Sequence, residues 1–393
     1  MKTGKVMNMV LMNKKSVRSN RCIRKAQKEA KKFYGRTRGD APKLKINTMV
    51  HFSKNEYVSL LNENTVYDGF AQQNNHAIQL KEDDFISLVK ESGLVGLSGN
   101  GFLTGEKLKT IQETKAKNRV LIINSVECDP ILIHDKWILS NKWEQVKQGI
   151  EILHENLQFI HIILATKEQT QSLSFDLGLN GDNGQQIKVK TVPNRYPMGQ
   201  EKQLIKNVLG MELSNNDIPA QMGILVLNVQ TIYAIAQIVG RKEKVHSRFI
   251  TVADLNTAIA KTVEVSIGAV VTKVIEAIFS GVKGQDIYTG SGIMSCHKAE
   301  EKEIVTMQTN FIAYGVSTNY DEANKCGKCG ACSSKCPVGV KVHKIVQAVE
   351  EGRNNGLEEF HPEKCIGCGA CTYVCHAGRN NQRDIAMVNG KLV

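Results

Sequence analysis

Eight of the eleven cysteines form two runs with the same spacing, C-x2-C-x2-C-x3-C. They are Cys326, Cys329, Cys332 and Cys336, followed by Cys365, Cys368, Cys371 and Cys375. Two intervening residues form a tight turn that brings successive sulfurs together, so three thiolates of a run bind one cubane and the fourth binds the other. Zinc ribbons use ligands in two pairs, and secreted disulfide scaffolds follow a signal peptide, which the first residues do not resemble. The spacing predicts two [4Fe-4S] clusters.

The position of the fourth cysteine predicts how the ligands are shared. We expect Cys326, Cys329, Cys332 and Cys375 to bind one cluster, and Cys365, Cys368, Cys371 and Cys336 to bind the other. Pro337 follows the first run, whereas His376 follows the second. Thiolate clusters without paired structural cysteines indicate a reducing, cytoplasmic compartment.

A glycine-rich segment at residues 96–107 follows a helix that we expect to begin near Asp84. Its backbone amides can surround a phosphate or lie flat against a ring, and Lys107 can balance a phosphate charge. The dinucleotide fingerprint requires a preceding strand and a helix that opens directly from the loop, which this segment does not fit. An ordinary glycine-rich turn is the alternative interpretation.

Polar residues follow several apolar segments that read as strands. We expect strands at 120–123, 159–166, 189–192 and 223–227, with helices at 142–157, from 200 onward and up to 239. Asn124 and Glu127 follow the first strand, and Asn228 and Thr231 follow the last. Ligands of open α/β sheets bind at the carboxyl ends of strands, so these side chains predict a polar site beside the glycine loop. Ordinary strand-to-helix turns are the alternative.

From about residue 80 to residue 382 the chain resembles the C-subunit family of the Rnf electron transport complex. This family includes proline reductase-associated electron-transfer proteins and cobalamin reductases, and it is similar to the flavin subunit of respiratory complex I. Its glycine loop G-x-G-G-A-G-F-P-T-x-x-K is matched by Gly96, Gly99, Gly101, Phe102, Thr104 and Lys107. Its N-G-A-E-C-E-P is matched by Asn124, Glu127, Cys128 and Pro130. Its other two motifs are matched by Tyr196, Pro197, Gly199 and residues 201–205, beginning with Glu201, and by Asn228, Val229 and Thr231.

The resemblance implies an α/β fold in several parts. These are an α/β domain for FMN and NADH at residues 81–242, a small β-grasp (SLBB-like) insert at 246–296, and an α-helical ferredoxin-like domain with two [4Fe-4S] clusters at 310–385. Residues 1–46 form a basic arm that we expect to be flexible, and residues 47–80 show no clear pattern.

The resemblance also implies a function, an NADH-dependent oxidoreductase or its electron-transfer subunit. NADH would reduce FMN, which would pass single electrons through the clusters to a partner, either a reductase or a membrane electron-transport complex. Lys107 would contact the phosphate, Asn124, Glu127 and Asn228 the ring or ribityl chain, and Glu201 the nucleotide. The expected location is the cytoplasm, or the inner face of the plasma membrane as a peripheral protein.

Three departures from the family pattern leave an alternative open. Ser98 and Asn100 replace a glycine and an alanine, and Leu103 replaces a proline, in the part of the loop expected nearest the cofactor. They favour a carrier or adaptor with [4Fe-4S] clusters but without flavin.

The net charge of +12 belongs to one end of the chain. Residues 1–46 hold fifteen Lys and Arg against two acids, a net charge of +13, and the remaining 36 basic and 37 acidic residues give −1. The basic arm is either a solvated segment or a segment that contacts anionic lipid or nucleic acid. Its charge gives no information on the chemistry of residues 47–393. A nucleic-acid-binding iron–sulfur protein is a third and less favoured alternative, because only the arm suggests it.

Overall fold

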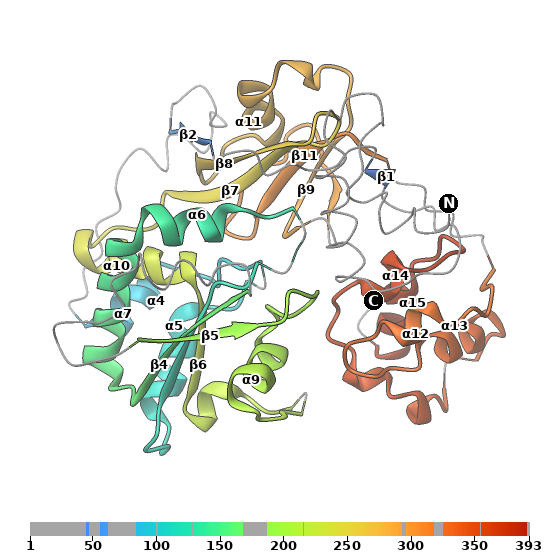
Figure 1. The fold of residues 1–393 in the computed structure, drawn as a ribbon, viewed down its shortest axis with the longest axis horizontal. Helices are drawn as coiled ribbons and strands as arrows, with labels where there is room; N and C mark the ends of the chain where they lie inside the picture. The colour runs from blue at the N-terminus through green and yellow to red at the C-terminus, as the bar shows by residue number, and fades with distance from the viewer. Residues whose placement is uncertain are drawn as a thin grey trace.

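The computed structural model describes residues 45–46, 56–61, 84–99, 101–127, 129, 131–167, 187–214, 216–292, 296–317, 325–353 and 355–390. The basic arm up to residue 44, most of segment 47–80, and Asn100, Cys128 and Pro130 lie outside these residues. Figure 1 shows a parallel sheet with its helices, a second sheet above it, and a small helical part to one side.

A four-stranded parallel sheet in the order β5-β4-β3-β6 forms the centre of the first part. Its strands are β3 (Val120–Asn124), β4 (His161–Lys167), β5 (Ile187–Val192) and β6 (Ile224–Asn228). The short apolar runs predicted as strands therefore pair with one another. They are continuously apolar because a parallel sheet is covered on both faces.

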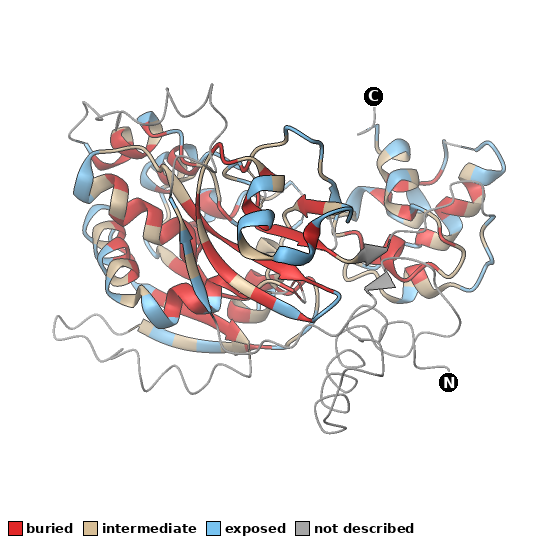
Figure 2. Cartoon of the chain, turned by 90° about the horizontal axis from the view of Figure 1, so that it is seen from above, coloured by how far each residue is buried: buried red, intermediate tan, exposed pale blue. Residues whose placement is uncertain are grey.

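Helices cover the two faces of this sheet. Leu121 and Ile123 of β3 pack in the core on one face, while Ile122 packs with residues of α9 on the other, as the alternation of side chains in a strand requires. The helices of this part are α4 (Phe85–Glu91), α5 (Thr104–Glu113), α6 (His134–Asn141), α7 (Trp143–Leu157), α9 (Glu201–Leu209), η3 (Pro219–Met222) and α10 (Val229–Arg241). Figure 2 shows the buried residues concentrated along the strands and the inner sides of the helices.

Helix α5 corrects the expected extent of the glycine loop. The loop ends at Leu103, which forms a bridge with Val95, and α5 begins at Thr104. A helix therefore opens directly from the loop, and Lys107 lies on it rather than in the loop. Only two residues of this helix, Leu108 and Ile111, are buried apolar side chains of any size, so the sequence offered a weak helical pattern.

A six-stranded mixed sheet in the order β10-β9-β11-β7-β8-β2 forms the second part. Its elements are β2 (Tyr57–Leu60), β7 (Ser247–Asp254), β8 (Ile259–Ser266), α11 (Val271–Ile278), η4 (Ser280–Val282), β9 (Ile287–Gly290), β10 (His297–Lys298) and β11 (Phe311–Tyr314). The sheet is larger than the expected insert at 246–296. It takes β2 from the segment that showed no pattern, and its inner strand β11 from residues that the sequence had grouped with the cysteine runs.

The third part is helical and contains both cysteine runs. Its elements are α12 (Ala331–Ser334), α13 (Val342–Glu350), η6 (Glu358–Phe360), η7 (Pro362–Lys364), α14 (Ala370–Tyr373) and α15 (Asn381–Val388). Gly330 and Gly369 precede α12 and α14 with φ values of 71° and 73°, so both runs turn in the same way. A left-handed conformation there suits glycine. A short ladder of β1 (Lys45–Ile46) with β12 (Val316–Ser317) lies upstream of this part.

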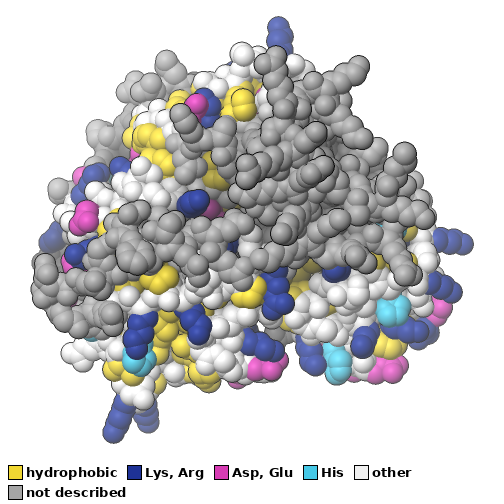
Figure 3. All heavy atoms as spheres, in the orientation of Figure 1, with side chains coloured by type: hydrophobic (Ala, Val, Ile, Leu, Met, Phe, Trp, Pro, Cys, Tyr) yellow, Lys and Arg dark blue, Asp and Glu magenta, His cyan; other side chains and the backbone are white. Residues whose placement is uncertain are grey.

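The face of the molecule that is seen in Figure 1 carries charges of both signs on its described residues. Figure 3 shows Lys and Arg side chains along its lower edge, with Asp and Glu among them. This mixture agrees with the near-neutral composition of the chain after residue 46.

Candidate redox site

One set of four cysteines surrounds a cavity of about 220 Å³ in the helical part. Cys326, Cys329 and Cys332 of the first run line it together with Cys375 of the second. Burial, and then the charges of the other three thiols, raise the pKa of Cys332 to about 12. The structure therefore brings together the four ligands that the spacing assigned to one cluster.

The other four cysteines also face one another. Burial, and then the charges of the neighbouring Cys336 and Cys365, raise the pKa of Cys368 to about 12. The pKa of Cys371 lies well above the usual value, because of burial and then the charges of Cys368, Cys365, Cys332 and Cys336. Cys336 thus lies with the second run although it belongs to the first.

The donor set of both groups suits iron–sulfur clusters. All eight cysteines are free thiols rather than disulfides. Backbone N–H groups point at three of the sulfurs, from Lys328 to Cys326 at 3.4 Å, from Val340 to Cys336 at 3.3 Å, and from Gly367 to Cys365 at 3.5 Å. Such N–H···S bonds tune iron–sulfur clusters, and sulfur is the ligand that iron takes in them.

The polar residues of the α/β part meet at one edge of the sheet. Asn124 and Asn228 end the neighbouring strands β3 and β6 and lie opposite each other in register. The Asn124 amide donates to the carbonyl of Gly199 at 2.9 Å, and the Asn228 amide donates to Asp135 at 2.6 Å. Three residues predicted from separate motifs, Asn124, Gly199 and Asn228, therefore adjoin.

Lys107 and Glu201 also lie together. The Lys107 ammonium is 2.5 Å from a Glu201 carboxylate oxygen and 2.9 Å from the carbonyl oxygen of Val226. Glu201 is in the first turn of α9, where the positive end of the helix favours an acid. The charge of Lys107 is thus balanced within the protein.

The glycine loop packs against the second sheet. Gly99 has a φ of 101°, and a Cβ atom there would lie 2.5 Å from the Cβ of Ser291. The loop amide of Leu97 donates to the buried hydroxyl of Thr231 at 3.0 Å, and Gly96 donates to the carbonyl of Phe102 at 2.8 Å. Gly101 likewise has a positive φ and faces Gln308. The side chain of Phe102 projects outward and is 59% exposed.

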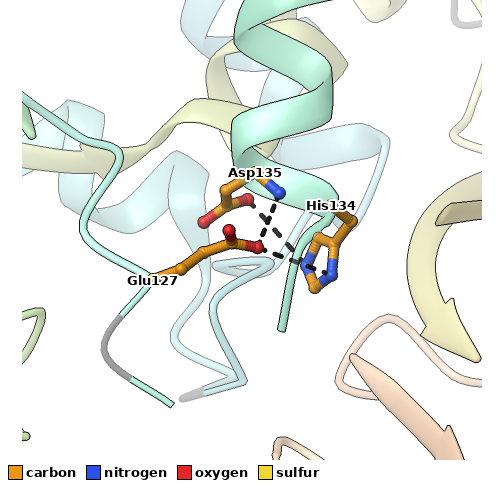
Figure 4. A group of neighbouring side chains, drawn as sticks. All are labelled: Glu127, His134 and Asp135. Carbon is orange, nitrogen blue, oxygen red and sulfur yellow. Dashed lines mark hydrogen bonds and ion pairs between the residues drawn. The ribbon is translucent and has the colours of Figure 1, made fainter. Parts of the chain in front are cut away.

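Glu127 belongs to a buried cluster with His134 and Asp135 (Figure 4). Its carboxylate accepts from the backbone N–H of Asp135 at 2.7 Å at the start of α6. Burial raises the pKa of Glu127, while burial and then Glu127 raise that of Asp135 well above its usual value. Burial, and secondarily Arg248, lower the pKa of His134 to about 3. Glu127 therefore holds the start of α6.

His134, Asp135 and Arg248 were not singled out from the sequence. Arg248 is 2% exposed and donates to the carbonyl of Leu97 in the glycine loop at 3.1 Å. The contact joins residues 151 positions apart, so no local pattern indicated it. The His134-Asp135 pair begins α6, ahead of the apolar residues Trp137 to Leu139, and this position is the one local signal in the sequence.

The edge of the sheet fits a bound flavin mononucleotide. Thr104, at the start of α5, is 1% exposed, and its hydroxyl has no hydrogen-bond partner among the described residues. The side-chain oxygen of Asn194, in the loop after β5, is likewise buried and unpartnered there. Buried polar atoms normally have partners, so these two suit a polar ligand. The helix N-terminus at Thr104 suits the phosphate of that ligand.

Comparisons with known proteins agree with this division. Residues 89–237 match the family model of the Nuo51 FMN-binding domain, and residues 318–376 match that of the 4Fe-4S dicluster domain. The first range contains all the residues predicted to contact FMN or NADH, and the second contains all eight clustered cysteines.

Curated relatives match most of the chain. The C subunit of the ion-translocating oxidoreductase complex of Haemophilus influenzae is 26% identical over 287 residues, which cover 72% of this chain and 43% of the relative. That of Rhodobacter capsulatus is 27% identical over 278 residues, which cover 70% of this chain and 53% of the relative. The chain is thus similar in sequence to the C subunits of ion-translocating oxidoreductase complexes. It spans about half or less of the length of these curated relatives.

The fold is similar to that of a solved oxidoreductase. The crystal structure of an NAD+-reducing [NiFe]-hydrogenase in the H2-reduced state matches with a TM-score of 0.54 and 17% identity, covering 79% of this chain and 62% of that one. At this identity the match concerns the fold alone. This relative of the Rnf-type C subunits, with its Nuo51 and dicluster regions, is thus an α/β protein followed by an iron–sulfur part.

Proposed function

We propose that this chain carries electrons from NADH to a protein partner, with FMN and two [4Fe-4S] clusters as its redox groups. FMN, when bound, would accept two electrons as hydride and release them singly, which the clusters require. The residues of the chain would hold these redox groups close to one another and exclude water from them.

The observation that carries the proposal is a contact between the α/β part and the cysteine part. The Tyr196 hydroxyl donates to the carbonyl oxygen of Cys368 at 2.5 Å. Tyr196 lies in the loop after β5, near the carboxyl edge of the sheet, and Cys368 belongs to the second cysteine set. This contact supports the proposal that the set containing Cys368 receives electrons from the flavin side.

At the flavin side, the free hydroxyl of Thr104 and the N-terminus of α5 would hold the phosphate of FMN. Asn124 and Asn228 would orient its ring, and Lys107 with Glu201 would form the polar wall toward the nucleotide. Phe102, which is exposed on the loop, offers an aromatic surface to an arriving base.

The partner is proposed to be a protein of a membrane electron-transport complex, as the names of the relatives suggest. We place the chain on the cytoplasmic side, at the inner face of the membrane. None of the described helices is long and apolar enough to cross a bilayer.

Anaerobic purification with cofactor analysis tests the proposal. We expect about one FMN and about eight iron atoms per chain, and bleaching of both the flavin and the iron–sulfur absorption by NADH. Full cofactor content without bleaching by NADH or NADPH would refute a nicotinamide donor.

A second candidate is an electron carrier or adaptor that has clusters but no flavin. The side chains predicted to contact FMN already form hydrogen bonds to other groups of the protein, which favours this candidate. They are Asn124, Asn228, Lys107 and Glu127. Eight iron atoms without extractable FMN would support this candidate, and stoichiometric FMN would exclude it.

A further inference from the structure

A second cavity lies between α10 and the strands β7 and β8, and Leu97 of the glycine loop borders it. It has a volume of about 500 Å³, within the usual range for small-molecule sites. Gln230, Tyr233, Gln237 and Arg241 line it from one face of α10. Arg241 lies thirteen residues beyond Asn228, or about 20 Å along the helix axis from the carboxyl edge of the sheet. The cavity therefore extends away from the residues expected to hold FMN.

Three buried nitrogen atoms that belong to residues of the cavity lining have no hydrogen-bond partner among the described residues. They are Nε2 of Gln230, Nε2 of His246 and Nε of Arg248. Gln230 is 1% exposed and Arg248 is 2% exposed. The remaining polar atoms of these two side chains are satisfied, since Oε1 of Gln230 accepts from the N–H of Phe249 at 2.7 Å and Arg248 donates to Leu97, Met307 and Asn310. Buried donors normally have acceptors, so no acceptor of the described lining reaches these three nitrogens.

The charges of the lining are mainly positive. Lys142, Arg241, Lys244 and Arg248 line the cavity with the acids Glu243 and Glu264, a net charge of +2 with His246 neutral. Both oxygens of Glu264 already accept hydrogen bonds, from Tyr57 at 2.6 Å and from Ser247 at 3.0 Å. Glu264 thus bonds Tyr57 and Ser247 rather than the three unpartnered donors.

One wall of the cavity is aromatic. Tyr233 and Phe249 both line it, with ring centroids 5.5 Å apart in an edge-on arrangement. A flat apolar group of a ligand can pack against such rings. The site thus combines hydrogen-bond donors and cations with an apolar wall.

We propose that this cavity binds a small organic anion, whose carboxylate or phosphate oxygens accept hydrogen bonds from Gln230, His246 and Arg248. The cations Lys142, Arg241 and Lys244 attract the anion, and its flat part lies against Tyr233. Because Arg248 also bonds the glycine loop through Leu97, the ligand contacts a residue that holds the loop in place.

The test is calorimetric titration of the full chain, purified anaerobically with its redox groups, with three probes. AMP joins a phosphate to a flat base, 2-naphthoate joins a carboxylate to a flat ring, and adenosine is the uncharged control. We expect AMP or 2-naphthoate to bind with one site per chain, and adenosine to bind at least about tenfold more weakly than AMP. Which anion binds more tightly distinguishes a phosphate ligand from a carboxylate ligand.

Variants locate the binding. Gln230→Glu keeps the acceptor for Phe249 but replaces the free donor with a carboxylate oxygen, and we expect it to weaken binding at least about tenfold. The double variant Arg241→Gln with Lys244→Gln changes only partly or fully exposed side chains, so it preserves the core, and it should also weaken binding. Lys283→Gln is the matched control, because Lys283 is exposed and does not line the cavity.

The outcomes are decisive in both directions. Loss of affinity in both cavity variants, with unchanged affinity in the control, supports the proposal. Failure of both anionic probes to bind overturns it. Equal affinity in either cavity variant also overturns it, because the probe then binds elsewhere, for example at the nucleotide site. Iron content and FMN content are measured on the same samples, so a failure of the proposed function is recognised separately.

Discussion

The ammonium of Lys107 on α5 and the carboxylate of Glu201 on α9 form an ion pair of 2.5 Å, although 94 residues separate them. The pair joins α5, which follows the glycine loop, to α9, which begins within the motif that contains Tyr196. Both side chains are partly exposed, at 18% and 29%. We expect this pair to lie where a bound flavin would meet solvent and an incoming nucleotide.

Replacing Lys107 should weaken flavin binding. We expect Lys107→Gln to lower FMN affinity about tenfold, because a hydrogen bond that involves a charged group contributes about 1.5 kcal/mol or more. Released FMN fluorescence per chain, after dialysis, measures the change. Lys109→Gln on the same helix is the control, since Lys109 pairs with Glu113 at 3.7 Å in an exposed position. Equal FMN retention by the Lys107 and Lys109 variants would show that Lys107 has no part in binding.

Exchange of the fourth cysteine should give a selective loss of one cluster. Cys375→Ser is expected to remove the cluster of the first run, and Cys336→Ser that of the second, each lowering iron from about eight to about four atoms per chain. Iron analysis and electron paramagnetic resonance of the reduced protein distinguish the two variants. Cys296→Ser should keep all the iron. If Cys375→Ser instead removed the second run's cluster, each run would supply all four of its own ligands.

The hydrogen bond from Tyr196 to Cys368 should affect transfer between the two parts more than flavin reduction. We expect Tyr196→Phe to slow the reduction of the clusters by NADH while leaving the reduction of the flavin unchanged. The lost hydrogen bond is also expected to lower the free energy of unfolding by about 1 kcal/mol. Stopped-flow absorbance at a flavin and at an iron–sulfur wavelength separates the two steps. Equal slowing of both steps would assign Tyr196 to flavin binding instead.

The parallel sheet and the two cysteine sets could be predicted from the sequence, because both depend on short-range patterns. Val120 to Ile123 is a continuous apolar run, and two or three residues separate each cysteine from the next within its run. Asn124 and Asn228 adjoin because parallel strands place their carboxyl ends at one edge, so the sheet alone brings these two motifs together.

The remaining contacts depend on pairings that no local pattern records. Strand β2 has only two inward residues, Val58 and Leu60, and it acquires its place by pairing with β8 more than 200 residues later. The links from Arg248 to Leu97 and from Tyr196 to Cys368 span 151 and 172 residues. These contacts explain why the buried cluster around His134 and the joint between the parts were found only in the structure.

The glycine loop should tolerate a side chain poorly at Gly99. This residue has a φ of 101° and lies against Ser291, so Gly99→Ala adds both backbone strain and a close contact. We expect the free energy of unfolding to fall by about 2 kcal/mol or more. Gly93→Ala is the matched control, with a φ of 69° and open space around its Cβ position, and it should cost about 1 kcal/mol. Chemical denaturation of the two variants compares them, and equal losses would mean that the contact with Ser291 yields easily.

The buried imidazole of His134 should make stability depend on pH in a defined direction. Its pKa falls from 6.5 to about 3 on folding, so below pH 6.5 the unfolded chain takes up a proton that the folded protein does not. The contribution of His134 to the free energy of unfolding is at its full value above pH 6.5. It is lost as the pH falls toward 3, by about 1.4 kcal/mol per pH unit. Glu127 and Asp135 act in the opposite direction, because their raised pKa values favour the folded state at low pH. His134→Gln removes only the first contribution. The difference in unfolding free energy between this variant and the natural protein should therefore change with pH between about 6.5 and 5 with that slope. A difference independent of pH would mean that His134 is protonated in the folded protein, paired with the two carboxylates.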